Sequence, residues 1–444
     1  MRTMRHGSKP LALFVLLMAV GSKAQVAVAP GPVMRLDSSA GNQLAPNTLV
    51  LGSGTAVSYD SNALNGQPPT PNVQYTVFPQ VGLNLARPRW DALISIVPGF
   101  SYSSANLPEY QAVSLTSAVT LQYRPSQRLS LNFLNSLVSS TNPFDSLTPA
   151  YQPGLGGVPN GTGPALNYLP RTNEVASADA AYNLNARTSL TALAAYDYIG
   201  YQHDPNVPNA AQPFQQSNSA QVSLGLHHNS SPRYQSSILF GAQLFDSGQG
   251  LVKTVAQSMQ YALQYSPKPT LLISAMIGPE YAQSSYGGGP DLGAGRGANL
   301  VNQRAAGWSW TASAAMAWTW GPNQLSAGAS RQLGLGTQYQ GNVEATFLRA
   351  DFHRQLPGRA DLALFGGYNI NKPMFLAQSV PRFSNNYLST GAALSKTIGS
   401  RWIVGIAYWY LLQNSPQNVG DLYSGDHSRV AISLSYSITK SLRK

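Results

Sequence analysis

The sequence predicts an all-β protein, a transmembrane, antiparallel, up-and-down β-barrel of about 18 strands. Three observations predict it: long runs in which apolar and polar residues alternate, turn residues between the runs, and few charged residues. Charged residues make up 10% of the chain, against about 25% in an ordinary soluble domain. Because successive side chains of a strand point to opposite faces, each run has one apolar and one polar face.

The length of the alternating runs separates a membrane barrel from a soluble β-sandwich. The runs reach about 12 residues, which at a rise of about 3.3 Å and a tilt of about 45° cover roughly 28 Å of bilayer. A sheet in lipid must close, because unpaired edge groups would have no partner there. The clearest apolar faces are Val113, Leu115, Val119, Leu121 and Tyr123; Val222, Leu224 and Leu226; and Val430, Ile432, Leu434, Tyr436 and Ile438.

Aromatic residues gather at both ends of the runs. Two such belts are typical of the aromatic girdles at the membrane interfaces. The set near the short turns is Trp90, Tyr123, Tyr234, Tyr265, Trp320 and Trp402. The opposite set includes Phe100, Tyr102, Tyr198, Tyr281, Trp308, Tyr368, Tyr408 and Tyr410.

The strand count follows from short turns that alternate with longer connections. Eight hairpins give about 16 strands, and a final strand over His427–Ile438 adds one more. An even, closed barrel then needs a first strand, for which Asn47–Asp60 is the candidate although its alternation is imperfect; without it the count is about 16. The short turns lie near Arg87–Trp90, Arg124–Arg128, Asn185–Thr188, Asn229–Pro232, Ser266–Pro269, Gly321–Asn323, Leu356–Arg359 and Ile398–Ser400.

The N-terminal residues have the composition of a secretory signal peptide. Basic residues precede an apolar stretch over Leu11–Val20, which is too short for a membrane helix, and small residues follow. We therefore expect cleavage after Ala24, a flexible periplasmic segment over residues 25–46, and one barrel over residues 47–444.

From about residue 47 the chain resembles porin-type outer-membrane barrels of diderm bacteria, in architecture and without a family motif. The resemblance implies a place in the bacterial outer membrane, contact with its lipid and with the barrel-assembly machinery, and passive or weakly selective diffusion of small solutes. A homo-oligomer is compatible with it. Two alternatives stay open: a barrel for secretion or assembly of an exopolysaccharide, and a non-conducting structural or adhesive barrel.

The longest connection, Ser140–Arg171, is a candidate constriction loop. It is the third outer loop if Asn47–Asp60 is a strand, and general porins fold that loop into the pore. Its candidate residues are Asp145, Tyr151 and Tyr168, and Asp145 is its only charge before Arg171, so filtering would be mainly steric. The alternative is an ordinary surface loop.

Some charged residues occupy positions of the alternation that belong to the polar, inward face, and these are candidates for setting ion preference. Asp179, Asp197 and Glu280 occupy such positions and lie far apart in the sequence, which argues against a catalytic carboxylate pair. Near Phe347 the alternation changes phase, and we expect a β-bulge there. The bulge would turn Arg349, Asp351 and His353 into the lumen near its periplasmic end, as a selectivity element or as a satisfied polar cluster.

The composition argues against several other classes of protein. With no cysteine, the chain has no disulfide and no thiolate ligand. Its basic residues are scattered, whereas nucleic-acid binding needs them clustered. His227 and His228 are adjacent in a strand and cannot share a metal, and no residues require a hydrolase, so we expect no enzyme, cofactor or metal. Without the four basic residues before Ala24, the charge is 24 minus 17, or +7, which favours anions.

Overall fold

The computed structural model describes residues 47–62, 71–104, 113–140, 171–201, 216–247, 252–286, 304–335, 342–373, 385–414 and 425–442. No helix in these ranges is long and apolar enough to cross a membrane. They form 18 strands: β1 (Thr48–Asp60), β2 (Asn72–Ala86), β3 (Trp90–Ser103), β4 (Val113–Tyr123), β5 (Leu129–Ser140), β6 (Arg171–Asn183), β7 (Thr188–Tyr201), β8 (Ser217–Ser231), β9 (Tyr234–Ser247), β10 (Val252–Lys268), β11 (Leu271–Tyr286), β12 (Arg304–Trp320), β13 (Asn323–Leu335), β14 (Asn342–Leu356), β15 (Ala360–Pro373), β16 (Asn385–Ile398), β17 (Trp402–Asn414) and β18 (Gly425–Ser441).

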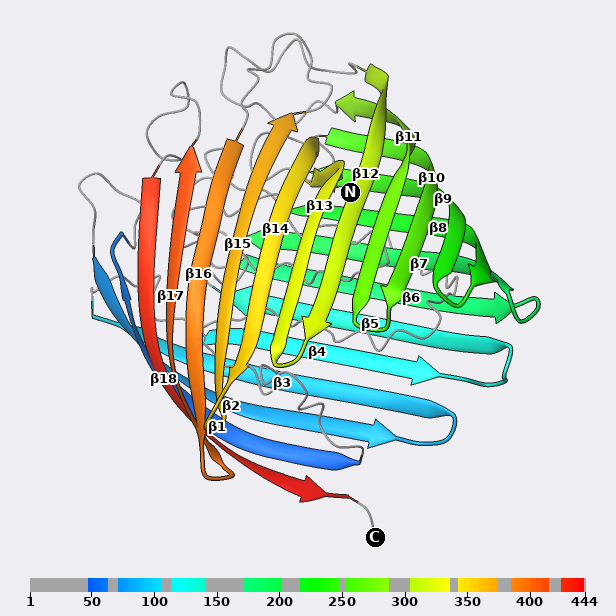
Figure 1. Ribbon diagram of the computed structural model, residues 1–444. Helices are drawn as coiled ribbons and strands as arrows, with labels where there is room; N and C mark the ends of the chain where they lie inside the picture. Colours follow the sequence, from blue (N-terminus) through cyan, green and yellow to red (C-terminus); the bar gives the residue numbers. More distant parts are fainter. Residues whose placement is uncertain are drawn as a thin grey trace, which may run out of the picture.

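The strands form one closed antiparallel barrel (Figure 1). Each strand pairs with the next in the chain, and β18 pairs with β1 from Thr48 opposite Ser441 to Asp60 opposite Arg429. The prediction of 18 strands is confirmed, and so is the first strand, which begins one residue after Asn47. The last strand is longer than expected at both ends and reaches Ser441.

The eight short turns lie where the turn residues predict them, with small shifts. β8 continues to Ser231 and β10 to Lys268, so their turns begin later than expected. Three turns contain a glycine with positive φ: Gly321 at 55°, Gly358 at 78° and Gly399 at 65°. A residue with a Cβ is strained in that conformation, which explains why glycine occurs there.

The two faces of the wall have the predicted character. Large apolar side chains on the outer face are exposed, among them Leu224 at 60% and Trp308 at 75%. The inner face carries buried hydroxyl and amide side chains such as Ser219 and Thr254. At the short-turn end, the rings of Trp402 and Tyr436 lie 4.8 Å apart on the outer face. The alternation of the sequence therefore corresponds to an apolar outside and a polar inside.

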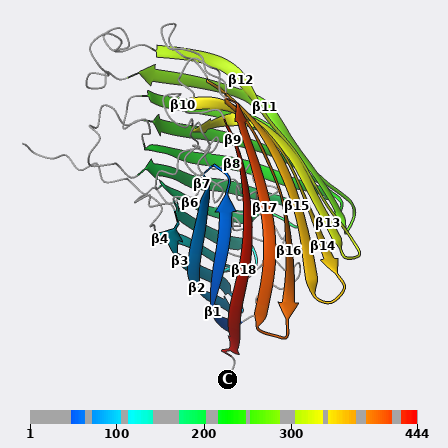
Figure 2. The same ribbon diagram turned by 90° about the vertical axis from the view of Figure 1, so that its left-hand side faces the viewer.

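The interior is partly filled with side chains. In Figure 1 the steep strands β13–β18 cross in front of the other wall, and the two groups converge toward β1 and β18. Figure 2 shows β1 beside β18, where the ring closes. Phe78 and Phe245 are fully buried on the inner face. Gly54 leaves room for the first of these rings, because a Cβ there would lie 2.2 Å from Phe78. The wall near β1 and β2 is therefore packed more like a protein core than an open pore.

The wall splits between β12 and β13 on the side opposite the short turn. These strands pair from Trp320 opposite Asn323 only as far as Ala312 opposite Arg331. In the same register, residues 308–311 would face residues 332–335, but no pair joins these described residues. β12 nevertheless pairs with β11, and β13 with β14, to their far ends. β13 instead approaches β8 across the interior. The half of β13 that lies away from the short turn is called upper β13 below.

Candidate functional site in the barrel interior

A cavity of about 90 Å³ lies inside the wall formed by β6 to β13. Polar and apolar side chains contribute to its lining, so it can hold a molecule with groups of both kinds. The polar lining includes Asp179, Thr191, Gln221, Ser223, His227, Gln243, Ser258, Gln260, Glu280, Thr311 and Gln332, and the apolar lining includes Leu193, Leu239, Ala256, Met276 and Leu333.

The three carboxylates predicted to face inward are all buried. Asn132 Nδ2 donates to Asp179 Oδ1 at 2.9 Å, and Ser219 Oγ donates to Asp197 Oδ2 at 3.4 Å. Asp179 and Glu280 line the same cavity, whereas Asp197 does not. The carboxylates predicted to be isolated thus include two that share one cavity, because the curvature of the barrel brings β6 and β11 to a common space. Their role in ion preference stays a prediction.

His227 and His228 point to opposite faces, as expected. His227 lies in the cavity with Nε2 at 2.6 Å from Thr191 Oγ1 and Nδ1 at 2.5 Å from Ser237 Oγ. His228 is exposed and contacts Thr188 Oγ1. A nucleophilic triad needs a carboxylate to orient its histidine, but both ring nitrogens of His227 are occupied by hydroxyl groups. This arrangement does not support hydrolysis.

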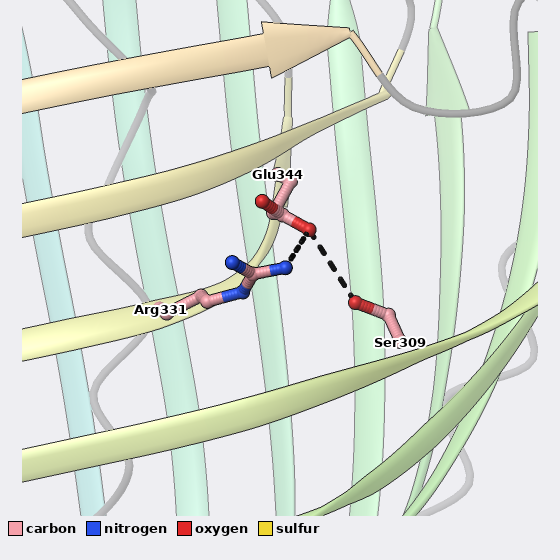
Figure 3. A network of polar contacts seen from close by, with 3 residues as sticks. All are labelled: Ser309, Arg331 and Glu344. Atoms are coloured by element: carbon pink, nitrogen blue, oxygen red, sulfur yellow. Dashed lines mark hydrogen bonds and ion pairs between the residues drawn. The ribbon is translucent and has the colours of Figure 1, made fainter.

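A group of side chains that includes an ion pair between β13 and β14 contacts β12 where the wall splits. Arg331 Nη2 of β13 lies 2.5 Å from Glu344 Oε2 of β14, and Ser309 Oγ of β12 donates to the same oxygen at 3.4 Å (Figure 3). The guanidinium of Arg331 also lies over the ring of Trp310, 4.1 Å from its centroid. Arg331 and Glu344 were not predicted as site residues, because their importance depends on a split that alternation does not reveal.

The cluster predicted on β14 exists, but the β-bulge predicted near Phe347 is wrong. β14 pairs with β13 and with β15 without a register shift. Phe347 is only 7% exposed on the inner face, and Leu348 is 49% exposed on the outer face. The phase changes because the inner wall is packed at this height and accepts an apolar ring, not because an extra residue is inserted.

Regular alternation is therefore enough to place Arg349, Asp351 and His353 on one inner face. The Arg349 guanidinium makes two hydrogen bonds of 2.6 Å to the Asp351 carboxylate. His353 Nε2 lies 3.8 Å from Asp361 Oδ1 of β15. This group lies toward the short-turn end, as predicted; Arg349 and Asp351 satisfy each other, whereas His353 Nδ1 is buried without a hydrogen-bond partner among the described residues. A selectivity role stays a prediction.

The candidate constriction residues Asp145, Tyr151 and Tyr168 lie outside the described residues, as do the signal peptide and residues 25–46. The described part of the chain contains a different element that narrows the interior. Leu333, near the end of β13, is 3% exposed and belongs to an apolar cluster with Ile199, Phe245, Ala256 and Ala282. These residues come from β7, β9, β10 and β11, so upper β13 covers the cavity from within.

A second polar group, which the sequence did not point to, lies inside the closing strands β1 and β18. Arg429 Nη2 donates to Ser58 Oγ at 2.8 Å and to Gln74 Oε1 at 2.9 Å. His427 Nδ1 lies 3.7 Å from Asp60 Oδ1. Across the described ranges, no three His, Asp or Glu side chains are grouped so that they could hold a metal ion.

Comparison with known proteins gives similar folds only. No family model matches the chain, and no curated protein sequence matches it. Among solved structures, Pseudomonas aeruginosa OpdO is similar at 11% identity, with 88% of this chain and 97% of that chain covered and a TM-score of 0.42. The P. aeruginosa outer membrane protein OpdK is similar at 9% identity, over 88% and 99%, with a TM-score of 0.42.

Acinetobacter baumannii OccAB2 is similar at 13% identity, over 88% of this chain and 98% of that chain, with a TM-score of 0.43. The barrel assignment rests on the strand pairing of this chain, which closes 18 antiparallel strands into a ring. The predicted architecture, a closed antiparallel barrel of 18 strands, is confirmed on that ground.

Proposed function

We propose that this protein is a channel of the bacterial outer membrane through which small polar solutes diffuse passively or with weak selectivity. The single observation that supports this most is the division of the closed wall into an apolar outer face and a hydrogen-bonding inner face. Where its strands are paired, such a wall satisfies its backbone groups in lipid, and its inner face offers polar contacts to what passes inside.

The proposal includes the route by which the chain reaches the membrane. A signal peptide would direct export and be removed after Ala24, and the barrel-assembly machinery would insert the mature chain. A homo-oligomer is part of the proposal as well. Mass measurement of the protein extracted from the membrane tests both points, because it gives the mature N-terminus and the number of subunits.

The solutes that we propose are small. The cavity at the inner wall, of about 90 Å³, is the space that such a solute would enter. Leu333 and Gln332 cover it from upper β13, so the narrow part of the passage lies between this strand and the wall of β6 to β11. The connection over residues 140–171 stays a second candidate constriction.

Planar-bilayer recording of the purified, refolded protein tests the channel. We expect discrete conductance steps, and smaller steps when Ser223 of the cavity lining is replaced by Arg, because a long charged side chain would fill a space of this size. A refolded barrel that gives no conductance step would contradict the proposal and favour a non-conducting barrel. Charge at the inner wall is expected to bias ion preference, which the reversal potential in a salt gradient measures.

A further inference from the structure

The split between β12 and β13 leaves strand edges without ladder partners. In the register of the lower part, Thr311 would face Gln332 and Trp308 would face Leu335, yet neither pair forms. Each of these strands keeps its ladder only on the other side, β12 with β11 and β13 with β14. In Figure 1 the upper end of β12 stands clear of its neighbour. Unpaired backbone groups are costly in lipid, so a split on the lipid-facing wall requires an explanation.

Side chains join the edges where the backbones do not. Glu344 accepts hydrogen bonds from Arg331 at 2.5 Å and from Ser309 at 3.4 Å, and the guanidinium also stacks on Trp310. These contacts connect β12 to β13 and β14 across the split (Figure 3). We call Ser309, Trp310, Arg331 and Glu344 the latch. A latch of side chains can be released more easily than a ladder of backbone hydrogen bonds.

The cavity lies directly behind the split. Thr311 on one edge and Gln332 and Leu333 on the other edge are part of its lining. Trp310, next to Thr311 on the outer face, is 46% exposed. The residues on either side of the split thus separate the cavity from the outside of the barrel at the level of the wall, and movement of upper β13 would connect the two.

The cavity lining indicates the kind of molecule that would pass. Gln243 Nε2 and Gln332 Nε2 are buried and have no hydrogen-bond partner among the described residues, while Asp179 and Glu280 supply acceptor oxygens. A hydroxyl group can accept from an amide and donate to a carboxylate. Among the described residues, this lining includes no Lys or Arg that could pair with an anionic head group. The apolar lining around Met276 and Leu333 and the apolar outer wall suit a hydrocarbon tail.

We propose that the split between β12 and β13 is a latched lateral passage, through which a neutral amphiphile with a hydroxyl head group moves between the cavity and the lipid outside the barrel. Release of the contacts that Ser309 and Trp310 of β12 make with Glu344 and Arg331 lets upper β13 move away from the edge of β12. The passage needs the barrel to lie in a bilayer, but not to conduct ions. If the barrel shows no conductance in bilayer recordings, the proposed channel is contradicted. The lateral passage is not contradicted by that result, because it does not require ion conduction.

The absence of cysteine from the chain makes a single thiol at the cavity a clean reporter. Thr311→Cys is made in the full-length protein and reconstituted in vesicles, and its rates of reaction with a long-chain alkyl maleimide and with a bulky, charged maleimide are measured. Arg331→Met with Glu344→Gln removes the latch without leaving one charge unpaired. We expect the alkyl reagent to react about tenfold faster, as for a contact network worth roughly 1.4 kcal/mol, and the charged reagent to react at its former rate.

A matched control removes another ion pair of the upper wall. Lys253 and Asp246 lie opposite each other on the fully paired β9–β10 ladder, with Nζ and Oδ2 3.8 Å apart. Lys253→Met with Asp246→Asn should not change either rate. Arg331→Lys keeps a cation beside Glu344 and should keep the alkyl reaction slow. Heat-modifiable mobility on a gel verifies that each variant is folded.

Two results would overturn the lateral passage: an unchanged alkyl rate in the folded latch variant, or an equal rise with the charged reagent, which would mean opening to water. The ligand class is tested on the same reporter by competition. 1-Octanol should slow the alkyl maleimide, and octanoate at the same concentration should not. If octanoate protects as well as octanol does, the proposed preference for a neutral hydroxyl head group is wrong.

Discussion

Asp60 and Arg429 lie directly opposite each other on β1 and β18, at the outer end of the ladder that closes the barrel. Both side chains are buried on the inner face. Arg429 also donates to Ser58 of its partner strand and to Gln74 of β2. One side chain of the last strand is therefore hydrogen-bonded to each of the first two strands, so it stabilises the closure at the point where the two ends of the sheet meet.

Replacement of Arg429 by Ala should destabilise the barrel. Hydrogen bonds to charged groups contribute about 1.5 to 3 kcal/mol each, so we expect a loss of roughly 2 kcal/mol or more in the free energy of unfolding. Urea titration followed by gel mobility measures this loss. Lys440→Ala, on the exposed part of the same ladder, is the control and should have no effect. An equal midpoint for both variants would show that Arg429 does not stabilise the closure.

Leu224 and Ser223 are neighbours on β8 that should respond oppositely to the same substitution. Leu224 is on the apolar outer face, and an Arg near the middle of a lipid-facing strand costs about 2 to 4 kcal/mol. Ser223 lines the cavity. We expect Leu224→Arg to reduce the yield of folded barrel in vesicles, and Ser223→Arg to fold normally but to conduct less. The reverse pattern would show that the faces are assigned wrongly.

The inward direction of Phe347 can be tested with its neighbour. With single cysteines introduced into a chain that has none, Leu348→Cys should react with a lipid-soluble maleimide in vesicles, and Phe347→Cys should react much more slowly. Phe347→Ala should also destabilise the barrel by about 3 kcal/mol, as expected for removal of a buried ring. Fast reaction at position 347 and slow reaction at position 348 would contradict the inward direction of Phe347 and support a β-bulge there.

Asp351 neutralises Arg349 on the inner wall, with two contacts of 2.6 Å. Asp351→Asn would leave a positive charge there, so we expect the reversal potential in a salt gradient to shift toward anion selectivity. Ala350→Asn, on the outer face of the same strand, is the control and should not shift it. A shift toward cations would exclude this cluster as a determinant of selectivity.

Much of the fold could be predicted from alternation and turn residues, because in a barrel each strand pairs with its neighbour in the chain. The first strand was the weakest prediction, since Gly52 and Gly54 occupy inward positions without a side chain. The structure explains the second of these glycines, because its Cβ would collide with Phe78. That contact depends on the register between β1 and β2, which no local pattern reveals.

For the candidate site, the sequence could predict the direction of single side chains but not which of them lie together. Alternation gave the inward direction of Asp179 and Glu280, but not that they share a cavity, since they lie on β6 and β11. Alternation along β13 would turn Leu333 outward, but this side chain is buried against the opposite wall because upper β13 leaves the edge of β12. The importance of Arg331 and Glu344 depends on the same departure. A strand leaves its neighbour in this way because of packing across the interior, and such packing does not change the alternation of apolar and polar residues in the sequence.

Because β1 pairs with β18, the neighbours of each strand in the wall do not depend on which strand comes first in the chain. The backbone N–H of Leu442 donates to the carbonyl of Asn47 at 2.7 Å, so the two ends of the ring touch. A gene rearranged to join residue 442 to residue 47, and to begin instead within another long connection, would encode the same neighbours all the way round. Only one ladder would then join strands distant in the chain, at the new opening, so the barrel should tolerate circular permutation.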